Sequence, residues 1–147
     1  MKPVVVMCLF CGTANRVDLG RVSEGPKCGS CGRPMHLDRP LPVTDATFDK
    51  VITGSSVPVV VDFYADWCGP CKMMAPALDD FARRHVGDVL VLKLDTDAHQ
   101  ATPARYAIRG IPTLIVFEQG REARRQVGAV QAAELEKLVP TVAAARS

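Results

Sequence analysis

Six cysteines stand in three pairs, each with two residues between its members, so their chemistry could be metal binding, structural disulfides or disulfide exchange. The pairs in CLFC and CGSC lie close together near the start of the chain, in a stretch rich in glycine. The pair in WCGPC stands alone, directly after a run of hydrophobic residues. Because the surroundings differ so much, we expect the same spacing to serve two kinds of chemistry.

Cys68 and Cys71 enclose Gly69 and Pro70 at a point where a predicted strand turns into a predicted helix. A cysteine at the start of a helix meets unpaired backbone N–H groups and the positive end of the helix dipole, which both favour the thiolate. Pro70 suits the first helical turn, where its missing N–H leaves no acceptor unsatisfied. We therefore expect Cys68 to attack a substrate disulfide and Cys71 to release the bound substrate thiol. The alternative, an inert bridge or half of a metal site, is disfavoured by a reducing cytosol.

The four N-terminal cysteines follow the pattern CxxC-x16-CxxC, which is typical of zinc ribbons. The expected ligands are Cys8, Cys11, Cys28 and Cys31. Four thiolates fill a tetrahedral zinc site and leave no open position, so we expect one structural Zn²⁺. Its binding would supply folding energy to a segment with few large apolar residues after Phe10. Two disulfides, or an iron held as in rubredoxin, are the alternatives.

Composition places the chain among globular proteins, since 48% of its 147 residues are hydrophobic and 23% are charged. The length suits one ordinary domain with a small appendage, and Arg39-Pro40-Leu41-Pro42 reads as a stiff junction between them. We therefore expect a zinc ribbon in residues 1–39 and a second domain in residues 40–147. A net charge of +2 does not favour nucleic-acid binding, and no secretory signal or membrane-length apolar run is evident. We expect a cytoplasmic monomer that binds neither nucleic acid nor membrane.

Hydrophobic patterns predict the elements that must position the cysteines. The first half of the second domain should contain a helix at 44–53 capped by Thr44, a strand at 57–64, a helix after WCGPC and a strand at 89–95. A helix at 98–107 should follow, and then a hairpin of 113–118 with 121–127 around Gln119-Gly120. The last helix should place Leu135, Leu138, Val139 and Val142 on one face, and Pro140 should disturb its end. Two buried strands that flank a helix imply a right-handed βαβ unit, and hence a partly parallel sheet.

The segment VDFYADWCGPCK resembles the active-site segment of the thioredoxin family, and RGIPT at 109–113 resembles its cis-proline loop. A later VGA at 127–129 follows in the same order, so the resemblance runs from about residue 41 to the end. With the ribbon included, the whole chain is similar to the zinc-containing thioredoxins of the thioredoxin 2 type. The resemblance implies an α/β fold, with a central mixed sheet flanked by helices and a small N-terminal zinc ribbon.

The same resemblance implies a protein-disulfide reductase that acts on disulfide-containing proteins. Its partner would be an NADPH-dependent thioredoxin reductase, which would recharge the Cys68/Cys71 pair and make the protein an electron carrier in cell redox homeostasis. A zinc- and redox-sensing chaperone or binding module is the alternative. An oxidase or isomerase fits less well, because Gly-Pro between the cysteines resembles the reducing members of the superfamily.

Asp62 and Lys93 interrupt two otherwise apolar strands, and a buried charge is costly unless it is paired or functional. The resemblance implies that Asp62 lies beneath the disulfide and assists proton transfer for Cys71, with Lys93 close by. The alternative is that Lys93 merely extends to the edge of the sheet.

The resemblance also implies a substrate-binding surface, formed by Trp67, Gly69, Pro70, Ile111, Pro112 and Gly128. A lone tryptophan is usually a core residue, but one beside a reactive cysteine on an exposed turn suits a contact surface. The resemblance alone implies a cis Ile111–Pro112 bond, since an arbitrary bond before proline is usually trans. The Ile111 backbone would pair with an extended substrate. Gly128, which has no side chain, would leave space for that substrate on the facing side of the surface. Tyr64 departs from the family, in which many members have tryptophan.

Overall fold

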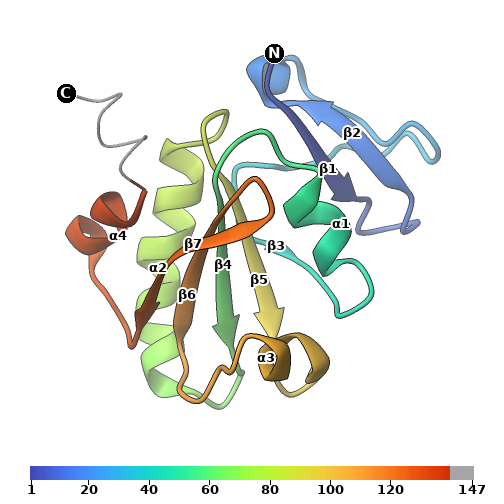
Figure 1. Ribbon diagram of the computed structural model, residues 1–147. Helices are drawn as coiled ribbons and strands as arrows, with labels where there is room; N and C mark the ends of the chain where they lie inside the picture. The colour runs from blue at the N-terminus through green and yellow to red at the C-terminus, as the bar shows by residue number, and fades with distance from the viewer. Residues whose placement is uncertain (140–147) are drawn as a thin grey trace.

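The computed structural model describes residues 1–139 and contains two β-sheets (Figure 1). The small sheet pairs β1 (Pro3–Met7) with β2 (Ala14–Asp18) and is followed by the 3-10 helix η1 (Leu19–Glu24). The large sheet has the order β3-β5-β4-β6-β7, and its strands are β3 (Leu41–Pro42), β4 (Val59–Tyr64), β5 (Leu90–Asp95), β6 (Thr113–Glu118) and β7 (Arg121–Val127). The helices are α1 (Phe48–Thr53), α2 (Gly69–Arg84), α3 (Ala101–Arg105) and α4 (Ala132–Leu138).

Strand β4 forms the centre of the large sheet and carries the backbone toward the WCGPC segment. It pairs in parallel with β5 and antiparallel with β6, so the sheet is mixed. Five of its six residues are buried, as the run of β-branched residues predicts for a strand covered on both faces. Strands β4 and β5 with α2 between them form the expected βαβ unit. The predicted α/β fold class is therefore confirmed.

Helices cover both faces of this sheet. On one face, α2 and α4 bury Met74, Leu78, Phe81 and Leu135 against side chains such as Val60. On the other face, α1 buries apolar side chains against β4, β5 and β6. That second core is made of Phe48, Val51, Ile52, Val59, Val61, Phe63, Leu90, Leu92, Ile115 and Phe117, among others.

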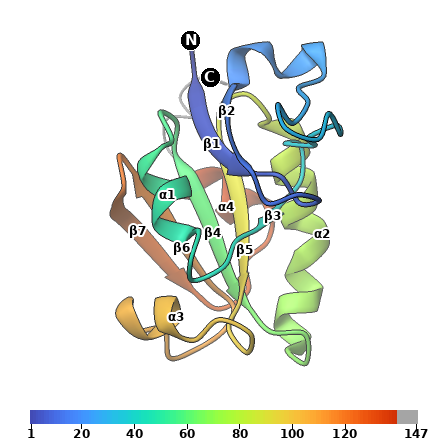
Figure 2. The ribbon, with the colours of Figure 1, turned by 90° about the vertical axis from the view of Figure 1, so that its right-hand side faces the viewer.

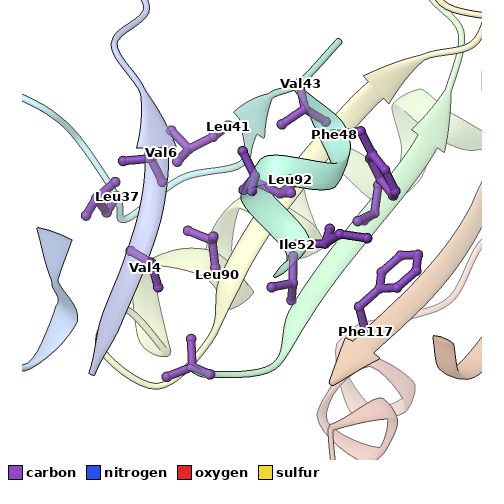
Figure 3. Close-up of a cluster of buried hydrophobic side chains, with 14 of the residues drawn as sticks. Val4, Val6, Leu37, Leu41, Val43, Phe48, Ile52, Leu90, Leu92 and Phe117 are labelled. Atoms are coloured by element: carbon purple, nitrogen blue, oxygen red, sulfur yellow. The ribbon is translucent and has the colours of Figure 1, made fainter. Parts of the chain in front are cut away.

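Strand β1 adds to this second core, which the sequence analysis did not predict. Val4 is fully buried and Val6 is 2% exposed, and both belong to the same apolar cluster as α1 (Figure 3). Figure 2 shows β1 running beside α1, and the Ser56 N–H donates to the Pro3 carbonyl at 2.9 Å. The N-terminal segment is therefore attached by apolar packing as well as by its cysteines.

Local differences from the predicted elements have simple causes. Thr44 and Thr47 form a turn in which each side-chain hydroxyl accepts the other's backbone N–H, so α1 begins only at Phe48. The predicted helix at 98–107 is reduced to α3. The Asp45 carboxylate accepts the N–H groups of Ala101 and Thr102 at its start, and Ala107 takes a left-handed conformation with φ 53° just beyond its end.

The β6–β7 hairpin is confirmed. Its turn residues Gln119 and Gly120 have φ of 54° and 78°, as a type I′ turn requires. The last predicted helix is observed as α4, while the expectations for Pro140 and Val142 lie outside the described residues. Within residues 1–139, no helix has the length and apolar character needed to span a membrane.

Candidate functional site

Cys68 and Cys71 form a disulfide at the start of α2, with their Cα atoms 5.3 Å apart. Cys68 is the N-cap residue, and its Sγ accepts a hydrogen bond from the Cys71 N–H at 3.2 Å. Gly69 and Pro70 form the first turn of the helix, where proline is favoured. The N–H bond to Sγ and the helix dipole both stabilise a thiolate on Cys68 once the disulfide is reduced.

The cis-proline loop forms the wall that faces Cys68. The Ile111–Pro112 bond is cis, as the resemblance implies. The Ile111 carbonyl oxygen lies 3.8 Å from Cys68 Sγ. The Gly128 N–H donates to the Pro112 carbonyl at 2.8 Å, and Gly128 adopts φ 94°, which disfavours any residue with a side chain. The structure thus brings Ile111, Pro112 and Gly128 together beside Cys68.

Trp67 lies on the exposed side of this site, with 70% of its surface accessible. Its indole Nε1 donates a hydrogen bond to the Asp97 carboxylate at 2.8 Å. The indole is therefore held in place by one polar contact while its ring stays available to a partner. Asp97 follows β5 and was missed by the sequence analysis, because nothing local marks it as a neighbour of a residue 30 positions away.

Asp62 and Lys93 occupy opposing positions on the parallel strands β4 and β5. Asp62 is 7% exposed, and its Oδ1 has no hydrogen-bond partner within the described part of the chain. Burial raises the pKa of Asp62 to about 7, although the positive charge of Lys93 opposes this rise. Both side chains line a cavity of about 250 Å³ that Cys71 also lines. A cavity of this size and polarity can hold water between the carboxyl group and the cysteine.

The N-terminal cysteines come together as a second chemical centre. The sulfur atoms of Cys8, Cys11, Cys28 and Cys31 all lie within 4.8 Å of one another. The Cys8–Cys31 and Cys11–Cys28 sulfur separations are both 3.6 Å. Four sulfurs at about 2.3 Å from a tetrahedral zinc would be about 3.8 Å apart, which is close to the two separations of 3.6 Å, so the number and type of donors fit zinc.

The backbone around these cysteines forms two matching turns. In each turn a glycine four residues after the first cysteine donates its N–H to that cysteine's carbonyl at 2.9 Å, and these glycines, Gly12 and Gly32, have φ of 78° and 76°. A residue with a Cβ rarely adopts such φ values, so glycine is required there. The repeated geometry presents two sulfurs from each turn to a common point.

Asn15 links the two turns and was also missed by the sequence analysis. Its side-chain nitrogen donates to Cys28 Sγ at 3.4 Å, and its oxygen accepts the Gly29 N–H at 2.9 Å. The N–H groups of Cys31 and Ser30 and the Asn15 amide together lower the pKa of the Cys28 thiol to about 6. Hydrogen bonds of this kind favour the thiolate that a metal ion requires.

Comparison with known proteins agrees with both centres. The family profile described as Thioredoxin matches residues 39–141, and the profile described as Thioredoxin 2, N-terminal matches residues 7–33. A thioredoxin from Haemophilus influenzae is 42% identical over 99 residues, which is 67% of this chain and 92% of that protein. Thioredoxin C-3 from Corynebacterium nephridii is 34% identical over 134 residues and covers 91% of this chain and 92% of its own length.

A solved structure of a mutant thioredoxin from Halobacterium salinarum superposes with a TM-score of 0.66 at 36% identity. The match covers 74% of this chain and 94% of that one. Fold and active-site pair together define a thiol–disulfide oxidoreductase. The chain belongs to the thioredoxin family, with an additional N-terminal segment of the thioredoxin 2 type. Its function is that of a protein-disulfide reductase, as the sequence analysis predicts.

Proposed function

We propose that this reductase works by an ordered exchange in which Cys68 is the nucleophile and Cys71 the resolving thiol. The Cys68 thiolate attacks one sulfur of a substrate disulfide, and the other substrate sulfur leaves as a thiolate that takes up a proton. The Cys71 thiolate then attacks Cys68 Sγ, which releases the second substrate thiol and leaves the Cys68–Cys71 disulfide. Two electrons pass from the protein to the substrate. The observation that carries this order is the position of Cys68 as N-cap, where its sulfur faces Ile111 and receives the Cys71 N–H.

Proton transfer at Cys71 is assigned to Asp62, with Lys93 setting the local charge. A carboxyl group with a pKa near 7 can both accept and return a proton at neutral pH, which an ordinary aspartate cannot do efficiently. The shared cavity supports this role, because it provides a route for the proton between Asp62 and Cys71. Lys93 opposes the effect of burial and so keeps the pKa of Asp62 within the useful range.

The substrate surface is assigned to the residues around Cys68. Trp67 and the exposed Gly69 and Pro70 form one side, and the cis-proline loop with Gly128 forms the other. The Ile111 N–H makes no backbone hydrogen bond within residues 1–139, so it is available to an extended substrate strand.

The N-terminal cysteines are assigned one structural Zn²⁺, held by Cys8, Cys11, Cys28 and Cys31. Bound zinc would cross-link the two turns of the ribbon, and four thiolates would leave it no open position for catalysis. We divide the chain into a ribbon at residues 1–39 and a thioredoxin domain at residues 40–147. We place the protein in the cytoplasm. The separate two-stranded and five-stranded sheets support this division, although β1 packs on the larger domain.

The recharging partner is an NADPH-dependent thioredoxin reductase. The test is a coupled assay with NADPH, a bacterial thioredoxin reductase and insulin, in which NADPH oxidation is followed together with zinc content. Wild-type protein should turn over with one zinc per chain, and Cys68→Ser should be inactive while it keeps its zinc. Cys8→Ser, whose cysteine lies in the ribbon, is the matched control and should retain turnover. No turnover by the wild-type protein, or full turnover by Cys68→Ser, would refute the proposal.

A further inference from the structure

Thr113 carries a buried hydroxyl group that the proposed mechanism does not use. It is the first residue of β6, and its backbone lies between Phe63 of β4 and Val127 of β7 in the large sheet. Its exposed fraction is 1%. A polar group that is buried to this extent needs a hydrogen-bond partner, so the partner of this hydroxyl shows what it does.

The partner lies in the loop that faces Cys68. Thr113 Oγ1 donates a hydrogen bond to the Gly110 carbonyl oxygen at 2.5 Å, because a carbonyl oxygen can only accept. No other hydrogen bond reaches this carbonyl within residues 1–139. The bond spans Ile111 and Pro112 and ties the loop to the first residue of a central strand. The Gly110 carbonyl is therefore turned toward the interior of the protein.

The direction of this carbonyl determines the direction of the Ile111 N–H. Both groups belong to one peptide bond, which is trans, since the cis bond of this loop is the next one, Ile111–Pro112. In a planar trans peptide the C=O and the N–H point in opposite directions. The Ile111 N–H therefore points away from the buried Thr113 hydroxyl, and it has no acceptor in the described part of the chain.

The other end of the loop is held in a similar way. The Gly128 N–H donates to the Pro112 carbonyl at 2.8 Å. Between the two held carbonyls, the Ile111 carbonyl oxygen lies 3.8 Å from Cys68 Sγ. The protein thus binds the carbonyls on either side of Ile111 and leaves the N–H of Ile111 free beside the reactive sulfur. An extended polypeptide binds to free backbone groups of this kind.

The hydroxyl bond matters because the loop has little other restraint at this peptide. Gly110 has no side chain, so rotation of the Gly110–Ile111 peptide plane meets little steric resistance. Rotation by about half a turn would reverse both polar groups and direct the N–H away from the substrate surface. Without the hydroxyl, the N–H would take several directions, and substrate affinity would fall with the fraction that points correctly.

We infer that Thr113 is a positioning residue for the substrate. By holding the Gly110 carbonyl, its hydroxyl presents the Ile111 N–H to a backbone carbonyl of the extended segment that carries the substrate disulfide. Thr113 itself contacts neither the substrate nor the reacting sulfurs. The identity of the bound segment rests on the proposed reductase function, while the orientation of the peptide plane does not.

The first experiment measures that orientation by NMR, through the residual dipolar coupling of the Ile111 N–H bond in the oxidised protein. Thr113→Val keeps the branched shape and removes the hydroxyl, whereas Thr113→Ser keeps the hydroxyl and removes the methyl group. Thr53→Val is the matched control, because the Thr53 hydroxyl makes the same kind of bond, to the Asp49 carbonyl at 2.6 Å, at the end of α1. The coupling should change in Thr113→Val alone. A wild-type coupling in Thr113→Val would overturn the inference.

The second experiment compares a peptide disulfide with bis(2-hydroxyethyl) disulfide, which has no peptide bond. Thr113→Val should raise KM for the peptide about tenfold with kcat little changed, as expected if the correct orientation falls to about a tenth of the population. Thr113→Ser and Thr53→Val should stay within about twofold of wild type, and reduction of the small disulfide should be the same in all four proteins. An unchanged KM in Thr113→Val, or an equal rise in Thr113→Ser, would overturn the inference. The second result would mean that packing of the methyl group sets KM.

A third experiment needs no variant that could misfold. In a second peptide the amide carbonyls beside the cysteine are replaced by ester carbonyls, which are weaker acceptors. Wild-type protein should bind the ester peptide with a KM about fivefold higher, the usual effect of weakening one hydrogen bond. Equal KM values for the two peptides would show that the Ile111 N–H is not used and would overturn the inference. If the wild-type protein reduced neither peptide nor small disulfide, the proposed function would fail instead, while the dipolar couplings would still report on the peptide plane.

Discussion

Asp62 lies directly opposite Lys93 in the parallel register of β4 and β5, yet Oδ1 of the Asp62 carboxyl group has no hydrogen-bond partner within residues 1–139. Burial raises the pKa of this group to about 7 from 3.8, which means that the neutral form is preferred in the folded protein below neutral pH. In the proposed mechanism the charged form of Asp62 is the one that accepts the proton of Cys71. Function and stability therefore make opposite demands on the same side chain.

The first prediction concerns pH-dependent stability. Between about pH 4 and pH 7 the folded protein holds the Asp62 proton while the unfolded chain has released it, so the free energy of unfolding falls as pH rises through this window. The raised pKa corresponds to about 4 kcal/mol in total, in order of magnitude. Asp62→Asn cannot titrate, so it should be more stable than the wild-type protein at pH 8, by an amount that shrinks toward pH 4.

Urea unfolding of the two oxidised proteins at several pH values measures this difference. Asp66→Asn is the matched control, because Asp66 is exposed on the same segment. A stability difference between Asp62→Asn and wild type that stays constant from pH 4 to pH 8 would contradict the assigned pKa.

The second prediction separates the two catalytic cysteines. Cys71→Ser removes only the thiol that resolves the intermediate, so substrates should accumulate as mixed disulfides on Cys68. Cys68→Ser should form none, because the N-cap sulfur that faces Ile111 is gone. Mass spectrometry of each variant after incubation with an oxidised protein detects the adducts. If Cys71→Ser instead turned over at the wild-type rate, the order of attack would be wrong.

Much of this site was predictable because local chemistry demands it. A proline in the first helical turn and a cysteine before it specify the start of α2, and an apolar run specifies β4. The CxxC spacing likewise predicts the four-sulfur cluster. The position of each of these features depends on the residues beside it in sequence.

Other features could not be predicted, since they depend on segments that meet only after folding. Asp97 reaches Trp67 because β5 ends beside β4, and the residues next to Asp97 in the sequence do not indicate that contact. The packing of Val4 on α1 is a second example, because a short valine run before a cysteine turn does not indicate which surface will cover it.

The third prediction uses Trp67, which is the single tryptophan of the chain and so reports on the site alone. Asp97→Ala removes the acceptor of its indole N–H, and the exposed ring should become more mobile. Time-resolved fluorescence anisotropy should show faster local motion, and KM for insulin should rise severalfold while reduction of a small disulfide changes little. Glu134→Ala is the control, because Glu134 is an exposed carboxylate on α4 and does not contact Trp67 or Asp97. Identical anisotropy decays for wild type and Asp97→Ala would show that the bond does not order the indole.

The fourth prediction concerns the metal. Cys28→Ser leaves three sulfur ligands and removes the sulfur that Asn15 and two backbone N–H groups contact. The protein should therefore lose its zinc or bind it with a much lower affinity. The turns around the cysteines should then open to proteases, while reductase activity persists within about an order of magnitude because α2 and β4 have a core of their own. Zinc stoichiometry, limited proteolysis and the insulin assay follow these outcomes. Retention of one tightly bound zinc would show that Cys28 is not a ligand.

The last prediction tests how firmly β1 is attached. A Cβ added to Gly54, just after α1, would lie 2.6 Å from Val5 Cγ2 and 2.9 Å from the Lys50 carbonyl oxygen, both too close for ordinary contact. The φ of Gly54 is −84°, so the backbone itself tolerates alanine and the strain arises from the neighbours. Gly54→Ala should therefore displace β1 from α1 and destabilise the protein by about 1–3 kcal/mol.

Hydrogen exchange locates this effect. The Ser56 N–H, which donates to Pro3, should exchange faster in Gly54→Ala, and the amides of β4 should be less affected. Ser56→Ala is the matched control, since it keeps that backbone hydrogen bond and adds no atom at the interface. Unchanged protection of the Ser56 amide together with unchanged stability in Gly54→Ala would mean that β1 is held by the cysteine turns alone, and that the buried valines contribute little to joining the two parts of the chain.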